Sequence, residues 1–252
     1  MPEFFSFISQ ADADSNVLQW LLFMLFKYMR MFIEGAGITL YVAVLGTIGG
    51  YLLGLLVGVT QDATSGKGRG VLGAALSAIT TLYVELFRGT PMIVQGMIIY
   101  YGLRQGGIEI SSIAAGTLVM MLNTGAYMAE TVRSGINAIS SGQREGALAM
   151  GVSRTGAMLH VILPQAIKNI IPEMCNTFLT NLKMTSVLNV IGVSELFYMA
   201  KTAGGTYYKY FEAYMAIALI YLVLCFVSSR LIALLEKKLQ GKSDYVLASE
   251  YM

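Results

Sequence analysis

A few polar side chains interrupt stretches that are otherwise apolar, and these residues are the ones most able to do chemistry. Lys183 stands in such a stretch, with Thr185 and Ser186 close by. An ammonium group in an apolar medium is costly, so it must be paired, face a cavity or reach an interface. Facing a path through the protein, it would bind a carboxylate; in a structural pair, it would bind Glu130 or Glu195. Near the end of a span, it would instead extend to the interface. The sequence leaves these three interpretations open.

A second polar set follows helical spacing. Asn123, Tyr127 and Glu130 are four and three residues apart, which places them on one face of a helix. We expect this face to point into a helix bundle, towards either a substrate or a neighbouring helix. Glu85 and Arg88 also share a helical face. Their spacing predicts an ion pair that is either structural or part of a gate.

The sequence offers little that could support catalysis. It has a single histidine, His160, and no Asp falls in the apolar stretches described below. A metal site or a catalytic dyad within those stretches is therefore not expected. The phosphate-binding pattern G-x-x-x-x-G-K-[ST] is also missing from the sequence, so this chain cannot be an ATPase of the P-loop type. We expect no cofactor on this chain, and we do not expect it to be an enzyme.

Helices in a membrane must position these polar residues. Hydrophobic residues make up 56% of the chain and charged residues 13%, and the mean hydropathy is +0.63. Roughly a quarter of the residues of a soluble domain are charged. Much of the surface of this chain must therefore face something other than water. The composition predicts an all-α integral membrane protein.

Five stretches are candidates for crossing the membrane, since about 20 apolar residues of helix span a bilayer core. The sequence does not fix the boundaries of the second, which can begin upstream of residue 89, or of the fourth. The predicted spans are residues 35–60, 89–103, 108–127, 170–199 and 212–230.

Five spans place the two termini on opposite sides of the membrane. With the N-terminus outside, more of the Lys and Arg residues lie on the cytoplasmic side, where they are normally retained. We therefore predict an N-terminal interfacial segment (residues 1–34), a transmembrane domain (residues 35–232) and a cytoplasmic C-terminal tail (residues 233–252). The apolar run at residues 17–26 is too short to span, and acidic rather than basic residues precede it. This pattern favours an interfacial helix over a signal peptide.

The longest polar stretch, residues 134–164, forms a predicted cytoplasmic loop. Ser141 can cap a first short helix, and Gly151 stands where a left-handed residue would end it. Ser153 or Thr155 can cap a second short helix, which we expect Pro164 to interrupt. Two short amphipathic helices favour a docking surface for a partner, and the alternative is a helical hairpin lying on the membrane.

The loop contains Glu145-Gly146-Ala147, then Gly151, and then Ile162-Leu163-Pro164. With these residues in this order, it resembles the EAA loop of ABC-importer permeases. Three further segments, at residues 85–91, 126–143 and 182–196, resemble the polar amino acid branch of that family and occur in the family's order. Three residues depart from the family pattern: Gly146 replaces an Ala, Met184 replaces an acidic or amide residue, and Val187 replaces a Leu. The residues that the resemblance assigns to ATPase coupling are Glu145, Gly146, Ala147, Gly151, Leu163 and Pro164.

The resemblance implies a type I permease core in a bacterial cytoplasmic membrane. Two permease subunits, identical or paralogous, would form the translocation path, and each loop would insert into a cytoplasmic ATPase dimer that uses ATP-Mg. An extracytoplasmic binding protein would deliver a polar amino acid, and no nucleic-acid partner is expected. The alternatives are an ABC permease for another small solute and a stand-alone channel or secondary transporter.

Overall fold

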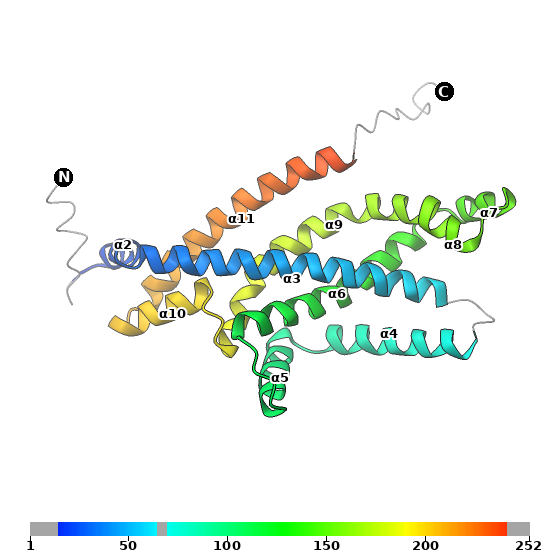
Figure 1. The fold of residues 1–252 in the computed structure, drawn as a ribbon. Coiled ribbons are helices and arrows are strands. Elements are labelled where there is room, and N and C mark those ends of the chain that lie inside the picture. Colours follow the sequence, from blue (N-terminus) through cyan, green and yellow to red (C-terminus); the bar gives the residue numbers. More distant parts are fainter. Residues whose placement is uncertain (1–14, 65–69, 241–252) are drawn as a thin grey trace, which may run out of the picture.

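The computed structural model describes residues 15–64 and 70–240, and every regular element within them is helical (Figure 1). The helix α2 (Val17–Lys27) begins with a capping box, in which Asn16 and Gln19 satisfy each other's backbone N–H groups. The helix α3 (Met29–Thr64) follows after Tyr28. Its 36 residues extend about 54 Å, which exceeds the roughly 30 Å of a bilayer core.

The remaining helices follow in chain order. The elements η1 and η2 are a π-helix and a 3₁₀-helix. The bounds are α4 (Val71–Gly89), α5 (Met92–Gln105), α6 (Ser112–Asn137), α7 (Ser141–Ala149), α8 (Arg154–Ala157), η1 (Met158–Ile162), α9 (Leu163–Met184), η2 (Thr185–Ile191), α10 (Leu196–Tyr207) and α11 (Tyr210–Gln240).

Three helices among the described residues are long and apolar enough to cross a membrane: Met29–Thr64, Val71–Gly89 and Tyr210–Leu235. They contain the first and last predicted spans, but the middle helix lies upstream of the predicted second span. The chain breaks between α4 and α5 because Pro91 forces Thr90 into an extended conformation. The predicted fourth span is also divided, since α9 ends at Met184 and η2 follows.

The helices α3 and α6 form the most extensive helix pair and lie side by side (Figure 1). Glycines recur every fourth residue along α3, and a Cβ atom on them would collide with α6. At Gly54 it would lie 2.9 Å from the carbonyl oxygen of Gly125, and at Gly58 it would lie 2.8 Å from that of Ala129. Small residues allow such close backbone approach between membrane helices. The contact therefore depends on these α3 glycines: Gly46, Gly50, Gly54 and Gly58.

A buried amide joins α9 to this pair. Asn181 is 7% exposed, and its Nδ2 donates to the hydroxyls of Thr47 on α3 (2.8 Å) and Thr124 on α6 (2.9 Å). An amide without partners in this position would be strongly destabilising. The three side chains thus fix the rotation of α9 against both helices.

Polar side chains also stabilise the two places where the chain breaks within the bundle. Gln95 donates to the carbonyl oxygens of Phe87 and Thr90, across the break between α4 and α5. Glu195 is fully buried and caps α10, accepting from the backbone N–H groups of residues 197 and 198 and from the hydroxyl of Tyr221. These bonds satisfy backbone groups that the helix interruptions leave free.

The close packing of α3 on α6 predicts unequal effects for two substitutions in the same helix. Gly58→Ala places a methyl group against a backbone oxygen that cannot move independently, so we expect a loss of about 1–3 kcal/mol, typical of overpacking. Gly37→Ala adds its methyl group to open space and is the matched control. Thermal unfolding in detergent measures both, and equal midpoints would contradict the packing argument.

Candidate functional site

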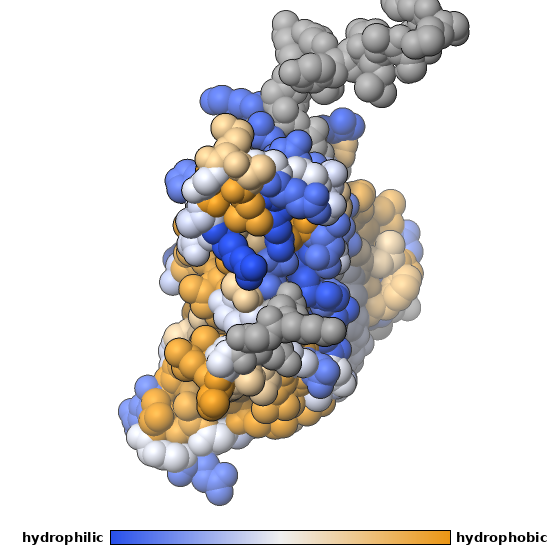
Figure 2. Space-filling view, turned by 90° about the vertical axis from the view of Figure 1, so that its right-hand side faces the viewer, coloured by the Kyte–Doolittle hydropathy of each residue, from blue (hydrophilic) through white to orange (hydrophobic). Residues whose placement is uncertain are grey.

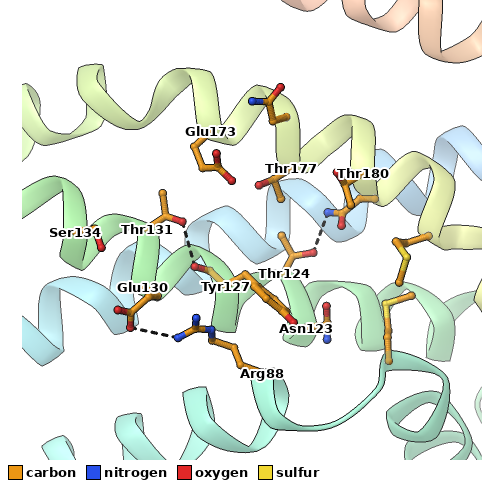
Figure 3. A pocket seen from close by; sticks show the side chains of 14 residues that line it. Arg88, Asn123, Thr124, Tyr127, Glu130, Thr131, Ser134, Glu173, Thr177 and Thr180 are labelled. Atoms are coloured by element: carbon orange, nitrogen blue, oxygen red, sulfur yellow. Dashed lines mark hydrogen bonds and ion pairs between the residues drawn. The ribbon is translucent and has the colours of Figure 1, made fainter.

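A pocket of about 620 Å³ with several polar and charged residues in its lining lies between α6 and α9 and reaches the end of α4. Figure 3 shows Arg88 entering from α4, Tyr127 and Glu130 along α6, and Glu173 on the facing side of α9. Hydroxyl and amide side chains are among the residues that line the wall between these charges. We call this cavity the central pocket. Its chemistry suits a small polar molecule that carries both positive and negative groups.

Glu130 organises the charged end of the central pocket. Its carboxylate forms ion pairs with Arg133 (2.5 Å) on the same helix and with Arg88 (3.5 Å) from α4. The Arg88 guanidinium also lies over the Tyr127 ring, 5.7 Å from its centroid. Because two guanidinium groups share one carboxylate, Arg88 has capacity for a second anionic partner.

The ion pair predicted between Glu85 and Arg88 does not form in the structure. Arg88 pairs with Glu130 instead, and Glu85 lies exposed on α4 with no ion pair among residues 15–64 and 70–240. The reason is tertiary: α4 packs against α6, so a carboxylate from α6 reaches the guanidinium. The sequence spacing along α4 could not reveal that competitor.

The six residues predicted for the substrate path do not lie together in the structure. Asn123, Tyr127 and Glu130 all line the central pocket. Asn123 also donates to the side-chain oxygen of Gln95 (3.0 Å), so it supports the α4–α5 break as well. A role for these three residues in binding substrate stays a prediction.

Lys183 and Ser186 line a different cavity, of about 420 Å³, against α10 and α11. Thr185 is fully buried and donates to the carbonyl oxygen of Leu182 (2.9 Å). Successive residues of a helix point about 100° apart, which explains why Met184 lines the central pocket and Lys183 does not. Within the described chain, Lys183 forms no ion pair with Glu130 or Glu195.

Sequence reasoning missed one wall of the central pocket, which α9 supplies. A signal was present, because these polar residues recur at intervals of three and four in a predicted span. That spacing indicates one helical face. The missed residues are Glu173, Asn176, Thr177, Thr180 and Asn181.

The predicted cytoplasmic loop folds as two short helices around a glycine turn. Gly151 has φ +81°, the left-handed conformation expected after the first helix. The expected Ser141 cap is wrong, because α7 begins at Ser141 and Ser140 occupies the cap position without a side-chain bond. Ser153 caps α8, accepting from the N–H of Gly156 (3.1 Å), which decides between the two predicted caps.

Pro164 does not interrupt the second helix as expected. Leu163 and Pro164 open α9, and the chain stays helical from α8 through the π-helix η1. Proline is tolerated in a first helical turn, where its missing N–H is of little consequence, and η1 supplies a wider turn just before it. The loop is therefore continuous with a helix that lines the central pocket.

The surface of this loop is available to a partner. Glu145 is exposed, Gly146 has open space around it, and Ala147 is the one buried residue of α7. At the glycine turn, Met150 is 84% exposed. Figure 2 looks onto this end of the molecule: hydrophilic surface and apolar patches lie together in its upper half, and hydrophobic surface predominates lower down. Such a mixed surface is typical of protein–protein contacts.

Comparison with known proteins identifies the family. Residues 50–241 match the model of the binding-protein-dependent transport system inner membrane component. A probable glutamine ABC transporter permease of Bacillus subtilis is 35% identical over 86% of this chain and 96% of its own length. An arginine transport system permease of the same organism is 36% identical over 83% and 92%.

Solved structures agree with this relationship. A crystal structure of an amino acid ABC transporter with histidines matches with TM-score 0.75 and 36% identity, covering 85% of this chain and 96% of that one. An inward-facing methionine ABC transporter matches with TM-score 0.71 at 20% identity, covering 85% and 99%, which shows a shared fold.

The family, the fold and the apolar helices agree, and they make this chain a multi-pass protein of the bacterial cytoplasmic membrane that is not itself an enzyme. In this family, ATP hydrolysis is carried out by a separate subunit. The chain belongs to the inner membrane components of binding-protein-dependent transport systems, and within them to the permease subunits of polar amino acid ABC importers.

Proposed function

We propose that this chain crosses the membrane five times, with the N-terminus outside, and forms half of a translocation path whose other half is a second permease subunit. A cytoplasmic ATPase dimer, using ATP-Mg, would drive it, and an extracytoplasmic binding protein would supply a polar amino acid. The proposed division is an interfacial segment (residues 1–34), a permease domain (residues 35–232) and a tail (residues 233–252), of which residues 241–252 lie outside the described structure.

The observation that carries this proposal is the charge arrangement of the central pocket. Arg88 offers a guanidinium to an α-carboxylate, and Glu173 offers a carboxylate to an ammonium group, while Glu130 holds Arg88 and Arg133 in place. Amide and hydroxyl side chains from α6 and α9 provide hydrogen bonds between these ends. A zwitterion needs this combination, because a buried charge must be paired to be tolerated.

The cytoplasmic loop of residues 134–164, which we call the docking loop, supports the proposal that an ATPase binds this chain. Glu145 is the middle residue of α7, not in its first turn, and it is exposed, so its carboxylate could pair with a basic residue of the partner. Gly151 sets the turn between α7 and α8 and exposes the apolar residues around it. Leu163 and Pro164 begin α9, so a force on the loop would reach the wall of the central pocket.

Charge reversal on the loop tests the ATPase contact. We expect Glu145→Lys to reduce recovery of the ATPase when the tagged chain is purified from native membranes in mild detergent. The substitution replaces an exposed carboxylate with an ammonium group, which would repel a basic residue of the ATPase. Glu109→Lys, an equally exposed site between α5 and α6, is the matched control. Equal recovery from both variants, quantified by mass spectrometry, would remove Glu145 from the contact.

Amino acid uptake in reconstituted proteoliposomes tests the central pocket. We expect Glu173→Gln to raise the KM for uptake about tenfold, the size of one lost hydrogen bond to a charged group. Lys183→Met, in the cavity against α11, should leave the KM unchanged. The reverse pattern would move the substrate path to the Lys183 cavity.

A further inference from the structure

An ion pair attaches the docking loop to α3. Arg144 of α7 donates to the carboxylate of Asp62, with 3.2 Å between Nη2 and Oδ2, although the two residues are 82 positions apart. Of the ion pairs within residues 15–64 and 70–240, this is the one that joins the loop to a membrane helix. The side chain of Asp62 is 12% exposed and that of Arg144 is 47% exposed. The pair is therefore sheltered on one side and accessible on the other.

Little else fastens α7 to α3. The backbone of α7 packs mainly against α8 and η1, and Ala147 is its one buried residue. Two cavities, of about 480 Å³ and 230 Å³, both have Asp62 and Arg144 in their walls. Because the pair stands between these cavities, the contact between α7 and α3 is polar and local. The second part of the loop is held differently, since Met158 and Ile162 belong to an apolar cluster that includes Leu55 and Val59 of α3.

Both charges stand at the ends of their helices where the backbone dipole opposes them. Asp62 lies in the last turn of α3, where the C-terminus carries partial negative charge, and Arg144 lies in the first turn of α7, where the N-terminus carries partial positive charge. Neither residue is favoured by its own helix. The ion pair between the helices offsets part of the cost of both placements.

The loop consequently has two routes into the membrane. One is covalent, through α8 and η1 into α9, which lines the central pocket. The other passes through the Asp62–Arg144 pair to α3, and from α3 through its glycine contact to α6, which forms the opposite wall. Movement of the loop along both routes would shift the two walls of the pocket together.

We propose that the Asp62–Arg144 ion pair is the link that transmits movement of the docking loop to α3, which makes both residues positioning residues for coupling ATP hydrolysis to transport. This inference rests on the proposed docking of the loop on an ATPase. It differs from that proposal in a measurable way, because the pair acts after docking.

The test uses the purified complex of this chain with its ATPase in proteoliposomes, supplied with the binding protein and amino acid. The readout is the number of amino acid molecules imported per ATP hydrolysed, with ATPase recovery measured in parallel. We expect Asp62→Asn and Arg144→Gln to retain the ATPase but to lower this ratio about fivefold or more, the lower limit of typical coupling between sites.

Exchanging the two charges of the pair distinguishes loss of this specific interaction from a general disturbance of the fold. Asp62→Arg combined with Arg144→Asp rebuilds the attraction and places each charge at the end of the helix that favours it. We expect the double variant to regain most of the lost ratio. Glu34→Gln, which breaks the exposed Arg30–Glu34 pair at the other end of α3, is the control and should leave the ratio unchanged.

Three outcomes would overturn the inference: an unchanged ratio in Asp62→Asn, a double variant no better than the single ones, or loss of the ATPase from Asp62→Asn. The last result would make the pair part of the docking surface rather than a link beyond it. Failure of the native chain to retain any ATPase would instead contradict the proposed function.

Discussion

The close approach of α3 to α6 is the constraint on which the rest of this permease depends. Apolar side chains gain little by leaving lipid for protein, so membrane helices associate through close van der Waals contact and hydrogen bonds. The glycines of α3 allow that contact, with backbone oxygens of α6 close to where Cβ atoms would be. Asn181 then joins α9 to both helices, and Tyr83 of α4 donates to the carbonyl oxygen of Leu122 on α6 (2.7 Å).

The central pocket follows from that framework. The wall from α6 and the wall from α9 are held at a fixed separation by the buried amide and its two hydroxyl partners. The breaks after α4 and α9 bring polar backbone into the bundle, which is tolerated only where other groups satisfy it. Gln95 and Glu195 provide those bonds and so have a structural role, and the charged side chains of Arg88, Glu130 and Glu173 line the pocket.

The docking loop has the opposite character. Its helices α7 and α8 are short and mostly exposed, and one polar pair attaches α7 to α3. The loop continues as helix into α9 through η1, which joins an apolar cluster around Ile162. The exposed part of such a surface can move without disrupting a packed core. The rigid contact between α3 and α6 lies beyond it and would carry such movement to both walls of the pocket.

Local rules of the chain were enough to determine much of this protein. Composition required a membrane environment, Gly151 predicted the turn of the docking loop, and the spacing of Asn123, Tyr127 and Glu130 predicted a shared polar face. These inferences depend on hydropathy, backbone conformation and helical periodicity, which neighbouring residues set. Only the tertiary structure decided that Arg88 pairs with Glu130, that Lys183 faces a second cavity, and that Arg144 reaches Asp62. These contacts depend on which helices pack together and on how each helix is rotated about its axis. Both are determined by interactions between residues that are far apart in the chain.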